Sequence, residues 1–186
     1  MPSFPELIEP LADGEVVVRQ AVEHDIPEVL IAYQDDPELH LRLGEERPPS
    51  GAELGRMSER TLEDLAGGRR MTLTIARAAS DVCLGQVNLL QVDWENARLD
   101  LGIWVAPRAR GKGLARTALR LVASWLLSEV GFERVQILTE TDNDRMLRAA
   151  RAAGFEYEGV LRQFLREQGS RVDVAVLSLV RRDLTG

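Results

Sequence analysis

The sequence predicts a mixed α/β fold with one central sheet and helices on both of its faces. Segments with strand character outnumber segments with helical periodicity. Two helical segments, at about 114–130 and 143–153, stand between strands and are interpreted as crossover connections. With 186 residues and 45% hydrophobic content, the chain has the size of one domain spanning residues 1–186.

The first half of the chain begins with a strand predicted over 14–20. A helix follows, whose apolar face consists of Ile26, Val29, Leu30 and Tyr33. The sequence Asp35-Asp-Pro37 ends this helix. A second helix begins at Ser50 and Glu53, which have the spacing of a capping box, and it ends at Gly67-Gly68. Its predicted buried face consists of Leu54, Met57, Thr61, Leu62 and Leu65.

The second half alternates strands with helices. A hairpin over 71–77 and 82–92 and a strand over 98–105 precede the helix at 114–130. A strand over 132–140 and the helix at 143–153 follow. The chain then closes with a hairpin whose strands, 160–166 and 171–180, flank the turn Glu167-Gln-Gly-Ser170.

A basic loop with two glycines joins the strand at 98–105 to the next helix. Between residues 101 and 128 there are five basic residues and no acidic one, and the net charge of −7 means that the remainder carries −12. The five are Arg108, Arg110, Lys112, Arg116 and Arg120. Because Gly111 and Gly113 have no Cβ, the backbone can turn several N–H groups toward one anion, and the helix adds its positive end. The loop predicts a cradle for a multiply phosphorylated ligand.

Two other phosphate-binding loops are excluded by their spacing. A dinucleotide fingerprint would need a third glycine where Arg116 stands. A Walker loop would need four residues between its glycines, followed by Gly-Lys and then Ser or Thr, and this pattern is also missing from the sequence.

The loop Arg108-Ala-Arg-Gly-Lys-Gly113, with Ala115 after it, resembles the Arg/Gln-x-x-Gly-x-Gly/Ala signature of the GNAT superfamily of N-acetyltransferases. Later segments, at 142–155, 158–162, 169–173 and 176–180, are similar to the RimJ/RimL branch, which acetylates N-terminal amines of ribosomal proteins. The resemblance implies a GNAT-type, mostly antiparallel central sheet of about seven strands. It also implies acetyl-coenzyme A as the cosubstrate.

The same resemblance implies roles for individual residues. Val105 would lie on the strand whose backbone pairs with the pantetheine arm, with its N–H toward the thioester carbonyl. Asn143 matches an asparagine that hydrogen-bonds that arm, and its alternative role is a plain helix N-cap. The residues implied to form the diphosphate site are Arg110, Gly111, Lys112, Gly113, Leu114, Ala115 and Arg116.

The catalytic groups depart from the family pattern. Met146 and Ala150 stand where relatives often have a serine near the sulfur and a tyrosine that protonates the departing thiolate. An ammonium must lose a proton before it attacks, and a carboxylate can take that proton directly or through water. Asp100 and Glu140 are the candidate bases, and an ordinary surface role is the alternative for both.

Composition argues against several other classes of protein. Cys83 is the single cysteine and lies in an apolar strand, so we expect a buried thiol rather than a nucleophile. His24 and His40 have no companions at metal-ligand spacing, so no metal is expected. The acidic balance disfavours nucleic-acid binding. Without an 18-residue apolar run or a signal-peptide pattern, a cytoplasmic protein with no membrane anchor is expected.

The expected reaction is acyl transfer from acetyl-coenzyme A to a primary amine, by direct attack in a ternary complex. Residues 1–70 hold sixteen acidic and seven basic residues, which favours a cationic acceptor, although an acidic surface also serves solubility. The acceptor is either an N-terminal amine or a small cationic amine. The competing hypotheses are succinyl transfer, acylation of an antibiotic or polyamine, and a noncatalytic coenzyme A-binding regulatory module. A homodimer is left open.

Overall fold

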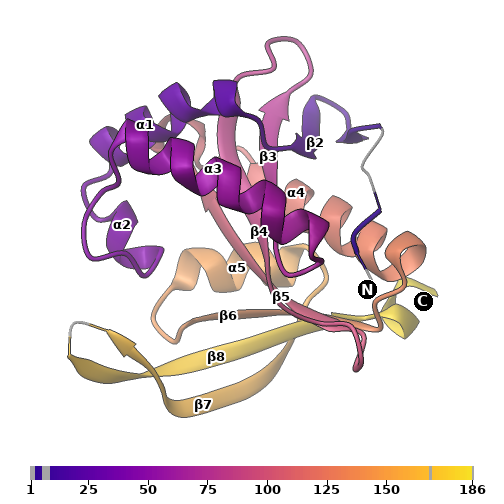
Figure 1. The fold of residues 1–186 in the computed structure, drawn as a ribbon. Helices are drawn as coiled ribbons and strands as arrows, with labels where there is room; N and C mark the ends of the chain where they lie inside the picture. The colour runs from indigo at the N-terminus through magenta and orange to yellow at the C-terminus, as the bar shows by residue number, and fades with distance from the viewer. Residues whose placement is uncertain (1–2, 6–8, 168, 186) are drawn as a thin grey trace.

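One eight-stranded sheet forms the centre of the protein (Figure 1). The structure, a computed structural model, describes residues 3–5, 9–167 and 169–185. Along the sheet the strand order is β1-β2-β3-β4-β5-β6-β8-β7. The strands are β1 Leu11–Asp13, β2 Val16–Gln20, β3 Met71–Arg77, β4 Cys83–Asp93, β5 Arg98–Val105, β6 Arg134–Glu140, β7 Glu156–Glu167 and β8 Ser170–Val180.

Neighbouring strands are antiparallel except for β5 and β6, which are parallel. This pairing confirms the mixed, mostly antiparallel sheet. The sheet has one strand more than the seven expected, because the three-residue β1 pairs with β2 and is too short to give a periodic signal. The parallel pair requires a crossover, which the helix between β5 and β6 supplies.

The helices cover both faces of the sheet, as expected. They are α1 Ile26–Asp35, α2 Leu39–Arg42, α3 Gly51–Ala66, α4 Leu114–Trp125 and α5 Asp144–Ala152. On one face α1 packs against β4 and α3 against β3, and on the other α4 packs against β1, β2 and β5 and α5 against β6 (Figure 1). A π-helical turn, Leu126–Val130, extends α4 to Gly131. The fully buried side chains come from both layers and include Leu73, Leu89, Leu99, Leu119, Ile137 and Leu177.

The helix predicted from Ser50 is present, but its buried face was predicted wrongly in part. Ser50 caps α3 by accepting from the Glu53 N–H at 3.3 Å, and Glu53 Oε2 accepts from the Ser50 N–H at 2.8 Å. Leu54 is buried, whereas Met57 is 43% exposed and Leu62 is 58% exposed. Both exposed side chains line a cleft, so their part of this face borders an opening, while Leu54 packs into the core.

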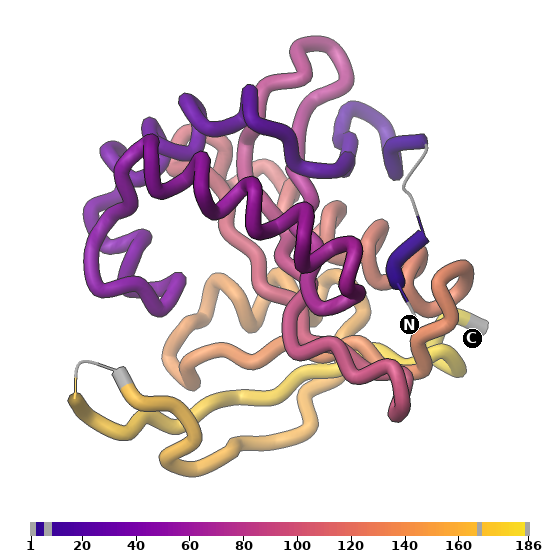
Figure 2. The backbone as a smooth tube through the Cα atoms, viewed as in Figure 1, coloured from indigo at the N-terminus to yellow at the C-terminus, as the bar shows by residue number. Residues whose placement is uncertain are grey.

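The two strands that close the chain form the outer edge of the sheet. β7 begins at Glu156, four residues before the predicted start, and pairs with β8. Gln168, in the predicted turn, lies outside the described residues. The hairpin extends past the rest of the sheet, as the yellow and orange trace in Figure 2 shows. Phe164 and Leu165 of β7 reach the same cleft that α3 borders.

Candidate active site

The loop between β5 and α4 forms an open cradle of backbone N–H groups. Gly111 and Gly113 have φ of +75° and +76°, a left-handed conformation that glycine adopts without strain. A Cβ at either position would meet no atom within 4 Å, so the space above both glycines is open. The first helical bond of α4 runs from the Thr117 N–H to the Gly113 carbonyl at 3.0 Å, which leaves the preceding N–H groups free of helical partners. The loop can therefore hold an anion at the positive end of α4.

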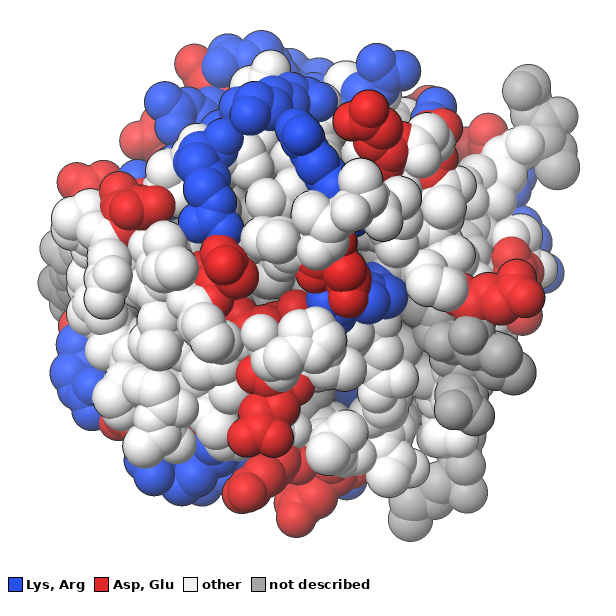
Figure 3. All heavy atoms as spheres, turned by 90° about the horizontal axis from the view of Figure 1, so that it is seen from above, with Lys and Arg blue, Asp and Glu red and all other residues white. Residues whose placement is uncertain are grey.

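The basic side chains of this loop differ in what they contact. Arg108 pairs with Glu28 of α1, and Arg120 pairs with Asp13. Lys112 Nζ donates only to the Arg108 carbonyl, at 3.2 Å, and Arg116 has no hydrogen bond or ion pair within the described part of the chain. Figure 3 shows Lys and Arg side chains gathered in an arc at the upper edge of one face. Lys112 and Arg116 are thus the cationic side chains available to a ligand in the cradle.

Strands β5 and β6 separate in their C-terminal halves, toward the edge of the sheet where the cradle lies. Their parallel pairing covers only three positions and ends at Asp100 and Gln136 (Figure 2). Beyond this point the remaining residues of both strands line a cleft of about 2930 Å³, which continues to Gly111, Gly113 and Arg116. The Ala106 N–H donates to Leu84 of β4, so by strand alternation the backbone groups of Val105 face the gap toward β6. The gap therefore offers an unpaired strand edge.

Val105 and Arg110 are joined at the mouth of this gap. Arg110 Nε donates to the Val105 carbonyl at 2.9 Å, and the other end of the guanidinium donates to Asp36 Oδ2 at 2.5 Å. The Arg110 side chain is thus engaged within the protein, while its backbone belongs to the cradle. The Val105 N–H, on the same edge of β5, lies beyond the last residue pair of β5 with β6.

The far wall of the gap is the end of β6 and the start of α5. Asn143 caps α5 by accepting from the Met146 N–H at 3.2 Å, and its Nδ2 donates to Glu140 Oε2 at 3.3 Å. Glu140 also accepts from Thr139 Oγ1 at 3.1 Å. Asn143 is therefore a helix N-cap, as the alternative had it, and it lines the cleft beside Glu140 as well.

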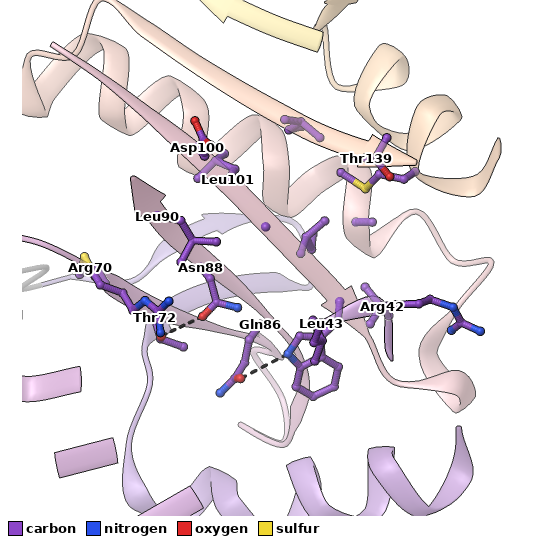
Figure 4. Close-up of a pocket in the computed structure, with 18 of the residues that line it drawn as sticks. Arg42, Leu43, Arg70, Thr72, Gln86, Asn88, Leu90, Asp100, Leu101 and Thr139 are labelled. Atoms are coloured by element: carbon purple, nitrogen blue, oxygen red, sulfur yellow. Dashed lines mark hydrogen bonds between the residues drawn. The ribbon is translucent and has the colours of Figure 1, made fainter. Parts of the chain in front are cut away.

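A polar floor, Thr72, Gln86 and Asn88 on β3 and β4, faces the cleft from the side of α1 and α3 (Figure 4). Thr72 Oγ1 donates to Asn88 Oδ1 at 2.9 Å, and the Trp104 indole donates to Gln86 Oε1 at 3.3 Å. This floor was not among the features expected from the sequence. Its signal is the alternation of Gln86 and Asn88 with apolar residues, in a strand covered on both faces.

Two half-buried carboxylates of the cleft form no ion pair within the described residues. Glu45 accepts from the Tyr33 hydroxyl at 2.8 Å, and burial raises the pKa of Glu45. Asp100 accepts from Gln136 Nε2 at 2.7 Å, and burial raises its pKa as well, because this hydrogen bond and the charges of Arg98 and Arg134 only partly offset desolvation. A raised pKa makes a carboxylate a stronger proton acceptor.

The acid excess of residues 1–70 is not concentrated in the cleft. Within that segment the described lining includes three acids and three bases. They are Asp25, Glu45, Asp64, Arg42, Arg69 and Arg70. Asp25 and Asp64 pair with arginines, which leaves Glu45 as the acid of this wall without an ion pair among the described residues, and Arg70 as the base without one.

Other sequence predictions concern groups outside the cleft. Cys83 is 2% exposed, and burial raises the pKa of its thiol to about 11, so it is no nucleophile at neutral pH. No cluster of three or more metal-ligating side chains occurs among the described residues. Within the same part of the chain, no helix has the length and apolar character that a membrane crossing needs.

Residues 15–156 match the family model described as Acetyltransferase (GNAT) domain. The chain belongs to this family of N-acetyltransferases.

A relative that matches over nearly its whole length is also named as an N-acetyltransferase. The chain is 24% identical over 173 residues to a protein of Bacillus licheniformis named uncharacterized N-acetyltransferase p20, covering 92% of this chain and 97% of that one. The fold of the present chain is similar to that of Mycobacterium smegmatis RimJ in complex with CoA-disulfide. The TM-score is 0.83 at 18% identity, and the match covers 96% of this chain and 88% of that one. It is also similar to a Vibrio cholerae spermidine N-acetyltransferase in complex with CoA and spermine, with a TM-score of 0.80, 17% identity and coverage of 94% and 100%.

Proposed function

We propose that this protein moves the acetyl group of acetyl-coenzyme A to a primary amine by direct attack, with both substrates bound at once. The observation that carries the proposal is the separation of β5 from β6 after Asp100 and Gln136, with the cradle at its mouth. An unpaired strand edge suits an extended, amide-containing arm, and the cradle suits a diphosphate.

The residues of the site fit coenzyme A. The open space at Gly111 and Gly113 is what a phosphate group needs above free N–H groups. The diphosphate site then comprises the backbone of Arg110, Gly111, Lys112, Gly113, Leu114, Ala115 and Arg116, with the side chains of Lys112 and Arg116. The Val105 N–H and Asn143 face the arm from the two walls of the gap. When bound, acetyl-coenzyme A supplies the activated acyl group.

The chain's own residues handle the acceptor's protons. In the reaction an N–C bond forms and the C–S bond breaks. Of the three ammonium protons, one stays on the amide nitrogen, one ends on the sulfur and one leaves through a base. Asp100 is the favoured base because burial raises its pKa, and Glu140, at the end of β6, is the second candidate. Ala150, which is buried, and Met146, which is half-buried, offer no hydroxyl to the sulfur, so water is its proton donor.

The acceptor we favour is an amine that is charged in solution, either an N-terminal amine or a small polyamine. Glu45 supports this class because it is a half-buried carboxylate of the cleft whose described partner is the neutral Tyr33 hydroxyl. The polar floor at Thr72, Gln86 and Asn88 supports an acceptor that also carries hydrogen-bonding groups, such as a peptide. The fold shared with RimJ and with a spermidine acetyltransferase is consistent with both kinds of amine.

Two measurements test this function. Calorimetry with coenzyme A measures cofactor binding, and a thiol-release assay with acetyl-coenzyme A screens N-terminal peptides, polyamines and aminoglycosides. We expect binding together with thiol release for at least one amine. Binding without release across the panel would instead support the noncatalytic module, the alternative that Met146 and Ala150 favour. Thiol release with succinyl-coenzyme A and not with acetyl-coenzyme A would show that the transferred group is succinyl and not acetyl.

The base is tested by the pH dependence of the same assay. We expect kcat/KM of the wild type to rise with pH through the raised pKa of Asp100. Asp100→Asn removes this rise and lowers the rate about 10²- to 10⁴-fold, the range for a positioned base. Glu140→Gln is the matched variant on the other wall. If Glu140→Gln removes the pH dependence and Asp100→Asn does not, the base is Glu140.

A further inference from the structure

Asp36, at the C-terminal end of α1, binds two arginines that come from different segments lining the cleft. Its Oδ2 accepts from Arg110 at 2.5 Å and from Arg42 at 2.8 Å. The Asp36 side chain is 9% exposed. Burial tends to raise its pKa, but the two guanidinium hydrogen bonds outweigh that effect and lower the pKa. This carboxylate therefore stays ionised and keeps both arginines bound at neutral pH.

Each arginine ties Asp36 to a different part of the site. Arg110 reaches on to the Val105 carbonyl at 2.9 Å, at the edge that faces the gap between β5 and β6. Arg42 ends α2, and Leu39, Arg42 and Leu43 line the acceptor side of the cleft. Figure 4 shows Arg42 and Leu43 at the end of the pocket away from Asp100. A continuous line of hydrogen bonds thus joins the edge of β5 to the wall formed by α2.

We propose that Asp36 is a positioning residue that, through Arg110 and Arg42, fixes the α2 wall of the acceptor cleft when the gap beside Val105 is filled. This inference rests on the proposed function, because it takes the gap as the cofactor site. It gives Arg110 a different task from Lys112 and Arg116, whose side chains have no carboxylate partner among the described residues.

The physical basis is the shared carbonyl of Val105. A ligand that pairs with this strand edge immobilises the backbone of Val105, and the Arg110 Nε bond transmits this restriction to Asp36. Because Asp36 is buried and holds both guanidinium groups, restricting one of them limits the freedom of the other. Arg42 then holds the last residue of α2, a four-residue helix too short to be stable by itself, whose first residue Leu39 is buried in the core. Coenzyme A should therefore order α2 without touching it.

Hydrogen–deuterium exchange with coenzyme A as the probe tests this inference without knowledge of the acceptor. In the wild type, saturating coenzyme A should slow exchange in residues 111–117 and, by about fivefold or more, in residues 39–45. In Arg42→Ala the slowing at 111–117 should remain and the slowing at 39–45 should disappear. Asp36→Asn should behave in the same way, and Arg42→Lys should restore part of the effect, since lysine can still reach Asp36.

Glu38→Gln is the matched control, because it removes the other, exposed partner of Arg42 and leaves Asp36 intact. It should keep the slowing at 39–45. The inference is overturned if coenzyme A leaves 39–45 unchanged in the wild type, or slows it equally in Arg42→Ala. If coenzyme A fails to slow 111–117 in the wild type, the proposed function itself is wrong.

Discussion

The arginine and lysine residues of the loop before α4 and of α4 itself act in different ways because their side chains have different neighbours. Arg108 and Arg120 form ion pairs with acids of α1 and β1. Arg110 bridges the Val105 carbonyl and the Asp36 carboxylate. Lys112 and Arg116 retain their donors for a ligand. A charge count alone cannot separate these groups, since all five residues belong to the same basic segment.

Lys112→Ala and Arg116→Ala should each weaken coenzyme A binding by about 1 to 3 kcal/mol, because each removes a charge-assisted hydrogen bond. Calorimetry measures the loss. If either residue contacts the 3′-phosphate, its loss shrinks with dephospho-coenzyme A, and equal losses place it on the diphosphate. Arg120→Ala is the control on the same helix, and its guanidinium is already bound to Asp13. An Arg120 effect as large as the other two would contradict the cradle.

Asp25 is the best candidate for a purely structural acid. Its carboxylate accepts from Arg19 at 2.8 Å, Thr74 at 2.7 Å and the Val22 N–H at 3.1 Å, and the residue is 2% exposed. Burial opposes ionisation, but these hydrogen bonds outweigh it and lower the pKa of Asp25. Such a group adds stability above its unfolded pKa of about 3.9, and the contribution is lost as the pH falls through the lower folded pKa.

Asp25→Asn should therefore lower the free energy of unfolding by about 3 to 5 kcal/mol at pH 7, because it leaves Arg19 buried without its main partner. Urea unfolding at pH 7 and at about pH 3 measures the effect, and the difference from wild type should be smaller at the acidic pH. Asp81→Asn removes the exposed partner of the same arginine and should cost less than about 1 kcal/mol. An equal loss of unfolding free energy in both variants would show that the burial of Asp25 does not set the strength of its ion pair with Arg19.

At the scale of elements, the site depends on the one parallel pair in an otherwise antiparallel sheet. Because α4 crosses over between β5 and β6, the two strands end at the same edge of the sheet, and the loop that begins α4 lies at that edge. Only three positions pair before the strands separate. The cradle and the gap thus arise from the same connection.

Gly111→Val should abolish coenzyme A binding, since the branched side chain would occupy the open space above the N–H groups. The same change strains the backbone, because φ at this position is +75°. Gly131→Val provides the control, with φ of +101°, open space around its Cβ position and a location outside the cleft. Calorimetry and thermal unfolding separate the two effects. Coenzyme A binding by Gly111→Val with wild-type affinity would exclude the cradle.

Local sequence patterns predicted most of the helices and strands. They did not predict which helical side chains line the cleft and which are buried in the core. Capping at Ser50 and the glycines after α3 set that helix, yet Met57 and Leu62 follow the helical period and are exposed. Periodicity shows which residues share a face, but what covers the face depends on elements far away in the sequence. The four-residue α2 and three-residue β1 are too short for any periodic signal.

The candidate site was predictable where one segment builds it and not where several segments meet. The cradle at 111–116 belongs to one loop and was expected from its glycines and charges. The contact between Tyr33 and Glu45, the floor at Thr72 and Asn88, and the bond from Arg110 to Asp36 each join positions that are distant along the chain. Such contacts depend on tertiary structure, which spacing alone does not specify.

At the scale of the whole molecule, the charge of −7 and the balanced lining of the cleft act at different ranges. Among residues 1–70 the lining contains three acids and three bases, so the acid excess of this segment lies mostly on other surfaces. An approaching cation therefore meets the long-range field of the molecule first and Glu45 only at contact. Long-range attraction is the part that salt removes.

Raising the ionic strength from about 0.01 M to 0.15 M shortens the Debye length from roughly 30 Å to 8 Å, so kcat/KM for a cationic amine should fall. Because the lining is balanced, we expect a fall of about two- to tenfold, at the low end for electrostatic steering. Thiol release at saturating acetyl-coenzyme A measures it, since saturation removes the effect of salt on cofactor binding. A neutral amine of similar size should show no fall. If the cationic amine also ignores salt, or acidic peptides react faster, the acidic surface serves solubility alone.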